Sequence, residues 1–248
     1  MTALSVNLNK VALMRNSRLS GIPSVTEAAR VALAHGADGI TVHPRPDLRH
    51  IRPDDVRELA AMLEVEFNIE GNPFEGAVGD YPGFLALVTE VKPQQCTLVP
   101  DAQDQLTSDH GWDLAVDGEH LRPIIAQLKQ QGIRVSLFMD ADSPDIERAA
   151  ALGADRIELY TESYADDYGT TAQASTFQRF VDAAARARAV GLGVNAGHDL
   201  NLDNLGLMAT IDGLEEVSIG HALIADALMM GLGPAVAAYK QILRQAQG

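Results

Sequence analysis

Cysteine is nearly absent from this sequence, since Cys96 is the only one among 248 residues. A single cysteine excludes an internal disulfide framework and a zinc site built from several cysteines. Long apolar runs are also lacking, because no stretch reaches the roughly 18 consecutive apolar residues that a transmembrane helix needs. Residues 1–10 do not show the basic start and apolar stretch of a secretory signal. We therefore expect a soluble cytoplasmic protein.

Basic residues are scarce, with 19 Lys and Arg against 34 Asp and Glu and a formal net charge of −15. This excess of acid argues against a general nucleic-acid binder or a protein of anionic membranes. The scarcity is uneven, because residues 1–52 hold seven basic and three acidic side chains, a local charge of +4. An anionic ligand is expected to bind at this basic part of the chain.

Short apolar runs alternate with longer amphipathic segments along the whole chain. The runs are typical of strands buried on both faces, and they cover residues 4–9, 39–43, 66–70, 95–99, 134–139, 156–160, 193–196 and 216–219. The helical patterns cover residues 24–35, 53–63, 81–91, 119–130, 144–152, 172–190, 202–211 and a long stretch from 222. Eight such units without a linker-like break predict one (β/α)₈ TIM barrel domain over residues 1–248, with a doubly wound open sheet as the alternative.

Loop lengths predict where the barrel carries its functional site. The similar phrases at 35–40 and 152–157 place a glycine after a helix and just before a strand, as in a left-handed helix cap with a short connection. The long connections, at 71–83, 101–118 and 161–171, instead follow strands, and residues 10–23 are also expected to form a loop. All of these fall at the carboxyl ends of the strands, which is where such barrels build active sites.

Polar side chains stand at the ends of six predicted strands, where a buried strand should be apolar. They are Asn7, Asn9 and Lys10, His43 and Arg45, Asn68 and Glu70, Glu158, Asn195 and His198, and His221. Each of these side chains, taken singly, could have a purely structural role, such as capping a loop or pairing with another buried polar group. Burying so many without partners costs several kcal/mol for each group, so their convergence on one barrel mouth indicates a site.

Three kinds of chemistry fit these side chains. His43, Glu70, His198 and His221 are possible metal ligands, although no characteristic metal-binding spacing supports that interpretation. Lys10 is a candidate Schiff-base lysine. Metal-free acid–base chemistry by His43, Glu70 and His198 on an anionic substrate is the third interpretation, because histidine and a buried carboxyl titrate near neutral pH.

The sequence near the carboxyl terminus indicates that the anionic ligand carries a phosphate group. Residues 218–222 run from a strand into a helical pattern, where free backbone N–H groups and the helix dipole attract phosphate. Barrels commonly bind phosphate through the loops after their seventh and eighth strands. Residues 195–198 supply the other half of such a site.

Several segments together resemble the pyridoxine 5′-phosphate synthase family. They are residues 6–9, 15–18, 41–51, 67–70, 98–100, 135–138, 157–159, 195–198 and 219–222. The resemblance implies a (β/α)₈ barrel that condenses 3-amino-2-oxopropyl phosphate with 1-deoxy-D-xylulose 5-phosphate and releases phosphate and water. It further implies a reaction without metal or organic cofactor, and a homo-oligomer that is commonly an octamer.

The resemblance also implies a role for each matching residue. His43 and Glu70 are expected to accept protons, His198 to donate one, and Glu158 to stabilise a transition state. The expected ligands of the aminooxopropyl phosphate are Asn7, Arg18, Gly220 and His221, and those of the xylulose phosphate are Arg45, His50 and Thr107. Ring closure needs repeated proton transfers, which agrees with several acid–base groups around two phosphates.

Three residues depart from the family pattern. The usual Asn-x-Asp-His after the first strand is here Asn-Leu-Asn-Lys, so Asn9 and Lys10 stand where contacts with the xylulose phosphate are expected. Lysine still offers a cation and hydrogen-bond donors. Asp199 replaces a usual glycine beside the expected phosphate site, and it is expected to be one of the substrate-binding residues. Two further functions stay open, namely another phosphosugar lyase or aldolase using Lys10, and a non-catalytic barrel that binds phosphorylated metabolites.

Overall fold

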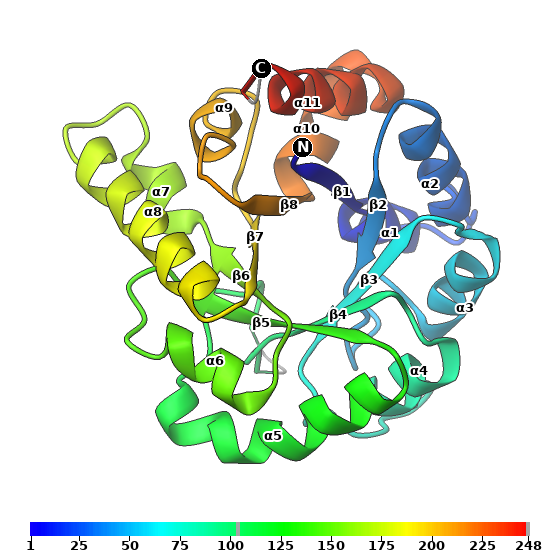
Figure 1. The fold of residues 1–248 in the computed structure, drawn as a ribbon. Coiled ribbons are helices and arrows are strands. Elements are labelled where there is room, and N and C mark those ends of the chain that lie inside the picture. The colour runs from blue at the N-terminus through cyan, green and yellow to red at the C-terminus, as the bar shows by residue number, and fades with distance from the viewer. Residues whose placement is uncertain (103–104, 247–248) are drawn as a thin grey trace.

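Eight parallel strands form a closed barrel in chain order in the computed structural model, which describes residues 1–102 and 105–246 (Figure 1). The strands are β1 (Ala3–Asn7), β2 (Gly39–Val42), β3 (Glu66–Gly71), β4 (Gln95–Leu98), β5 (Arg134–Asp140), β6 (Arg156–Tyr160), β7 (Gly193–Gly197) and β8 (Leu214–Ile219). Pairing of β1 with β8 closes the ring. The predicted (β/α)₈ barrel is confirmed, and the open sheet is excluded.

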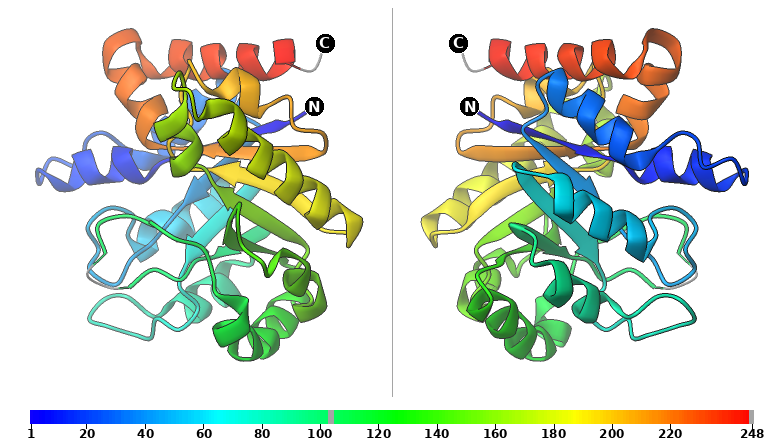
Figure 2. Two further views of the ribbon diagram at one scale, coloured as in Figure 1. Left: turned by 90° about the vertical axis from the view of Figure 1, so that its left-hand side faces the viewer. Right: turned by 90° about the vertical axis from the view of Figure 1, so that its right-hand side faces the viewer.

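Helices surround the barrel and connect its strands. They are α1 (Asn9–Asn16), α2 (Val25–Ala34), α3 (Pro53–Met62), α4 (Phe84–Val91), α5 (Leu114–Gln130), α6 (Ile146–Leu152), α7 (Glu162–Asp167), α8 (Gln173–Ala189), α9 (Leu205–Met208), α10 (His221–Met230) and α11 (Leu232–Ala246). Figure 2 shows that α1 and the long loops after β2, β3 and β4 project from one end of the barrel. Within the described residues, no helix has the length and apolar character needed to cross a membrane.

Successive side chains along each strand point alternately outward and inward. The outward ones form an apolar layer beneath the helices, and the inward ones make the barrel interior polar. The outward side chains, such as Leu4, Ile40 and Ile157, are fully buried against the helices. The inward ones carry hydroxyl, amide and carboxyl groups, and neighbouring strands satisfy them. For example, the Thr97 hydroxyl donates to Asn68 Oδ1 at 3.1 Å. Polar groups therefore continue from the barrel mouth into its interior.

The first connection differs from its predicted form, because residues 9–16 form α1 and not a loop. Asn7 Oδ1 accepts the Asn9 N–H at 3.0 Å, which satisfies a free donor at the start of the helix. Val11 and Ala12 are buried beneath it. The prediction was wrong because this helix buries few residues and has a weak apolar periodicity. As a result, β1 ends at Asn7 and Lys10 lies in the first turn of a helix.

Other boundaries differ for similar local reasons. The α5 helix begins at Leu114, within the expected loop, because the Asp113 carboxylate accepts the N–H groups of Ala115 and Val116. The long carboxyl-terminal pattern divides at Gly231, whose φ of +91° takes the chain out of α10 before α11 begins. The expected glycine caps are confirmed at Gly36 and Gly153, with φ of +103° and +98°.

An ion pair with a buried lysine attaches α11 to the barrel, and replacing Lys240 with methionine is expected to destabilise the protein. Lys240 is 6% exposed, and its ammonium pairs with the half-exposed Asp38, which also accepts the Leu4 N–H at 2.7 Å. Methionine keeps the apolar stem but removes the charge, at a cost of about 1–3 kcal/mol in the free energy of unfolding. Urea denaturation measures this loss.

The matched control for that prediction is Lys129→Met. Lys129 pairs with Asp155 at 2.7 Å, but both side chains are partly exposed, at 41% and 30%. A solvated pair of this kind contributes less than about 1 kcal/mol. Equal losses in the two variants would contradict a special role for the burial of the Lys240 ammonium.

Candidate active site

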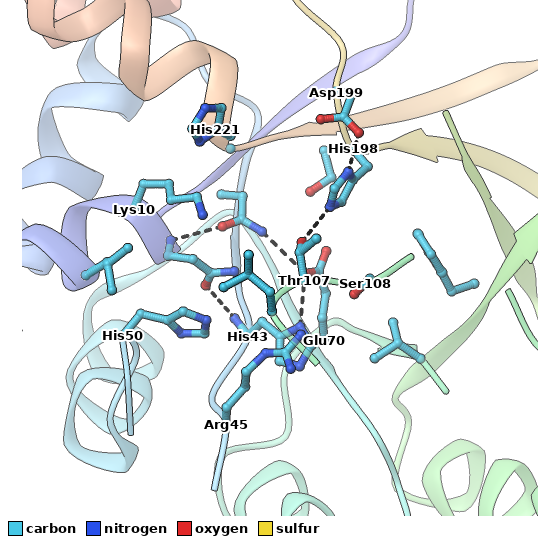
Figure 3. Close-up of a pocket in the computed structure, with 18 of the residues that line it drawn as sticks. Lys10, His43, Arg45, His50, Glu70, Thr107, Ser108, His198, Asp199 and His221 are labelled. Atoms are coloured by element: carbon cyan, nitrogen blue, oxygen red, sulfur yellow. Dashed lines mark hydrogen bonds and ion pairs between the residues drawn. The ribbon is translucent and has the colours of Figure 1, made fainter. Parts of the chain in front are cut away.

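A cavity of about 350 Å³ opens at the carboxyl ends of the strands. All but one of the residues predicted for the site line it, namely Asn7, Asn9, Lys10, His43, Arg45, His50, Glu70, Thr107, Glu158, His198, Asp199, Gly220 and His221. Figure 3 shows that side chains from distant parts of the chain, including Lys10, His43 and His198, converge here. Arg18 is the exception, since it is exposed and does not line the cavity of this chain.

Glu70 lies near the end of β3 and faces His43 across the cavity floor. Its Oε2 lies 3.9 Å from His43 Nδ1 and accepts a hydrogen bond of 3.3 Å from Asn7 Nδ2. Burial raises the pKa of Glu70 to about 8, with further repulsion from Asp101 and Glu216. Glu70 therefore exchanges a proton close to neutral pH, as an acid–base catalyst must.

The two histidines of the loop after β2 are held neutral. Burial lowers the pKa of His43 well below its usual value, and the charge of Arg45 adds to this effect. Burial and Arg45 likewise lower the pKa of His50 to about 3. His50 Nδ1 accepts the N–H of Ile51 at 2.9 Å, and the His43 N–H donates to Asn9 Oδ1 at 2.8 Å. The loop is thus fixed, and His43 is available as a neutral base.

Glu158 lies deeper, on β6 inside the barrel, and is 2% exposed. Burial raises its pKa well above the usual range, and the nearby Glu70 raises it further. The Thr97 hydroxyl oxygen lies 3.4 Å from Glu158 Oε2. Two buried carboxyl groups that repel each other favour holding a proton between them, so this pair can supply or receive one within the cavity.

His198 follows β7 and has a hydrogen-bond partner on each ring nitrogen. Its Nδ1 lies 2.6 Å from Asp199 Oδ2, and its Nε2 lies 2.8 Å from Thr107 Oγ1 (Figure 3). The ring also packs edge-on against Tyr160, with centroids 5.2 Å apart. Thr107 belongs to the loop after β4, so this contact brings that loop across the mouth of the barrel.

Arg45 holds the same loop through a buried ion pair with Asp101. Its Nη1 also donates to the carbonyl oxygen of Gln105 at 3.2 Å. Arg49 donates to the carbonyl oxygens of Gln105 and Leu106 at 3.0 and 3.1 Å. Two arginines from the loop after β2 therefore fix the loop after β4, and both of them line one wall of the cavity.

The opposite wall is formed by the start of α10 and the first turn of α1. Gly220 precedes α10, and a Cβ at this position would lie 3.2 Å from Asn7 Cβ, so a larger residue would crowd the cavity. The free N–H groups at the start of this helix attract anions. Lys10 and His221 lie at the same wall (Figure 3). The cavity thus has two separate regions suited to phosphate.

Some lining residues were not predicted from the sequence. They are Arg49, Ser108 and Ser218 among the polar ones. A hydrogen bond from Ser218 to Glu70 partly opposes the rise in the pKa of Glu70. Ser218 could have been found, because it stands on β8 two residues before Gly220 in the segment that predicted the phosphate site. Nothing in the sequence marks Asp101 as the partner of Arg45.

Asn68 and Asn195 were also noted at strand ends, but both are fully buried inside the barrel and do not line the cavity. Asn195 Nδ2 donates to Glu216 Oε1 at 3.3 Å. These two amides therefore satisfy other polar groups of the barrel interior. Among residues 1–102 and 105–246, no three His, Cys, Asp or Glu side chains group as metal ligands.

Named proteins from other organisms are similar to this chain over nearly its whole length. Pyridoxine 5′-phosphate synthase of Xanthomonas axonopodis pv. citri (strain 306) is 57% identical over 247 residues, which cover 98% of this chain and 97% of the relative. The protein of the same name from Albidiferax ferrireducens is 55% identical over 249 residues and 98% of each chain.

Solved structures of low sequence identity share the barrel fold. Phosphoribosyl anthranilate isomerase from Thermotoga maritima matches 99% of this chain and 100% of its own, with a TM-score of 0.60 and 15% identity. Thiamine phosphate pyrophosphorylase from Pyrococcus furiosus matches 100% and 97%, with a TM-score of 0.57 and 13% identity. The sequence model of the pyridoxal phosphate biosynthesis protein PdxJ matches residues 4–245. This chain therefore belongs to the PdxJ family of pyridoxal phosphate biosynthesis proteins.

Proposed function

We propose that this protein is a pyridoxine 5′-phosphate synthase of vitamin B6 biosynthesis. It condenses 3-amino-2-oxopropyl phosphate with 1-deoxy-D-xylulose 5-phosphate and releases phosphate and water. The observation that carries the proposal is the pairing of Glu70 with neutral His43 at 3.9 Å, inside a cavity with cationic groups on two walls. Ring closure needs protons to be moved at several carbons and oxygens, and Glu70, whose pKa burial raises to about 8, exchanges protons near neutral pH beside the neutral His43.

The proton-transfer roles follow from the environment of each group. His43 is neutral and Glu70 titrates near pH 8, so both accept protons from substrate. His198 faces them from β7 and donates a proton to a leaving oxygen. Glu158 lies deeper in the barrel than Glu70 and, with its carboxyl protonated, stabilises a transition state by donating a hydrogen bond. The reaction needs no metal or organic cofactor.

The phosphate ligands divide between the two walls of the cavity. Asn7, Gly220 and His221 hold the aminooxopropyl phosphate at the start of α10. Arg45, His50 and Thr107 hold the xylulose phosphate, and Asn9 and Lys10 are further contacts of that substrate. Arg18 is a further ligand of the aminooxopropyl phosphate in this proposal, although its side chain lies outside the cavity of a single chain.

Location and assembly are part of the same proposal. The protein acts in the cytoplasm on small phosphorylated substrates, and it does so as a homo-oligomer of eight subunits. Exposed Leu228, Met229 and Met230 at the end of α10 support self-association, because exposed apolar clusters often form subunit contacts. Nucleic acids and membranes are not partners, since the chain carries a net charge of −15.

Incubation of the purified protein with both substrates is expected to yield pyridoxine 5′-phosphate and one equivalent of inorganic phosphate. Ultraviolet absorbance of the pyridine ring and a phosphate assay measure the two products. Each substrate alone is the control and should give neither. Absence of product from folded protein would overturn the proposal. Borohydride trapping of a substrate on Lys10 would instead support an aldolase, and binding without turnover a metabolite sensor.

A further inference from the structure

The turn after β7 has an unusual backbone that places a carboxylate against His198. His198 and Asp199 both adopt a left-handed conformation, with φ of +76° and +45°. Residues other than glycine seldom do so, and positions of this kind persist only where the surrounding structure holds them. Here Leu200 donates its N–H to the His198 carbonyl at 2.6 Å, and Asn204 Nδ2 donates to the Asp199 carbonyl at 3.2 Å.

The contact fixes which nitrogen of His198 carries the proton. A hydrogen bond with His198 lowers the pKa of Asp199, and attraction to His198, His221 and Lys10 lowers it further. Asp199 is therefore ionised, and an ionised carboxylate can only accept a hydrogen bond. His198 Nδ1 must then be the donor across the 2.6 Å contact. The other nitrogen, Nε2, is left to face the cavity.

Thr107 marks the side of the His198 ring that faces the cavity. Its hydroxyl lies 2.8 Å from Nε2, and both residues line the cavity. Asp199 Oδ2 contacts the other ring nitrogen. The carboxylate can therefore orient the imidazole from behind while Nε2 faces the cavity.

We infer that Asp199 is a positioning residue for the proton donation proposed for His198. It holds Nε2 toward substrate oxygen and stabilises the imidazolium that donates the proton. This inference rests on the proposed function, in which His198 is the donor. It replaces the expectation that Asp199 binds substrate, because a carboxylate facing a substrate phosphate would repel it.

Other ionisable groups lie around this pair. They are Lys10 on α1, Asp109 in the loop after β4, Tyr160 on β6, Glu162 on α7 and His221 on α10. Of the side chains that the structure describes, Asp199 and Thr107 are those with a hydrogen bond to the His198 ring. Asp199 is therefore the charged group whose removal should alter the imidazole most.

Asp199→Asn tests the inference by removing the charge while keeping the shape, and asparagine tolerates the left-handed conformation. We expect kcat to fall at least about tenfold, while KM for each substrate changes less than about twofold. The pH profile of kcat should also differ from that of the wild type, because the His198 ring loses its carboxylate partner. Asp203→Asn, an exposed acid of the same loop, is the matched control and should leave kcat and the profile unchanged.

A double variant distinguishes action through His198 from a direct contact with substrate. His198→Gln and His198→Gln with Asp199→Asn should have equal residual activity, since Asp199 has no imidazole left to hold. A further fall in the double variant, or an Asp199→Asn enzyme with wild-type kcat and pH profile, would overturn the inference.

Nuclear magnetic resonance of ¹⁵N-labelled histidine gives a readout that needs no activity. In the wild-type protein, the neutral His198 ring should carry its proton on Nδ1, and Asp199→Gly should lose this preference. His198→Gln assigns the signal. A wild-type protein that makes no product but shows the Nδ1 proton would overturn the proposed function alone. A neutral wild-type ring protonated on Nε2 would overturn the inference alone.

Discussion

Replacing Glu70 with glutamine is expected to lower kcat by about 10²–10⁴-fold, the usual contribution of a general acid–base group. Glutamine keeps the size of the side chain and can still accept the hydrogen bond from Asn7 Nδ2. It cannot accept a proton from substrate. The variant should remain folded, because it replaces one of two buried carboxyl groups that repel each other. Steady-state formation of pyridoxine 5′-phosphate measures the loss.

The pH dependence of kcat/KM of the wild-type enzyme should show the titration of Glu70. Burial raises the pKa of Glu70 to about 8, so the carboxyl is mostly protonated at pH 7. A proton acceptor works only when ionised, and kcat/KM should therefore rise as the pH increases from 7 toward 9. The residual activity of Glu70→Gln should lack this rise.

Glu64→Gln is the matched control for both measurements. Glu64 is exposed and precedes β3, at the opposite end of the strand from the cavity. The same chemical change there should leave kcat and the pH profile unaltered. Activity of Glu70→Gln within tenfold of the wild type would show that Glu70 is not the proton acceptor.

The barrel could be predicted from the sequence because its strand and helix patterns repeat with few exceptions. Buried parallel strands leave a clear apolar signal, and glycines such as Gly36 and Gly153 mark the returns to the next strand. The α1 and α7 helices were missed, since they are short and were assigned to loops. Local capping by Asn7 decides the start of α1, and this contact depends on backbone geometry that a pattern does not encode.

Most of the cavity lining could be predicted for a different reason. The closed parallel barrel brings all strand carboxyl ends to one mouth, so residues such as His43 and His198 must converge there once the fold is known. Contacts between loops follow no such rule. The pairing of Arg45 with Asp101 and that of Thr107 with His198 depend on how the loop after β4 crosses the barrel. The sequence shows only that this loop is long and polar.

Gly197 links the backbone of β7 to the chemistry of the cavity, and Gly197→Ala is expected to reduce kcat at least about tenfold. An alanine Cβ would lie 2.1 Å from Glu158 Oε1 and 3.3 Å from the Ser218 carbonyl oxygen. Glu158 is 2% exposed and must turn away from Gly197 within a packed interior. The crowding should also cost about 1–3 kcal/mol in the free energy of unfolding.

Combining Gly197→Ala with Glu158→Asp separates crowding of the carboxyl from a general disturbance of β7. The shorter aspartate side chain lies farther from the added methyl group, so the double variant should largely regain the free energy of unfolding lost in Gly197→Ala. If β7 itself were disturbed, the free energy of unfolding of the double variant would stay low. Gly206→Ala is the matched control, because its Cβ would meet only Ile242 Cγ2, at an ordinary 3.6 Å. That change should leave kcat unaltered and slightly favour the α9 helix. Wild-type kcat in Gly197→Ala would mean that the position of the Glu158 carboxyl does not limit the reaction.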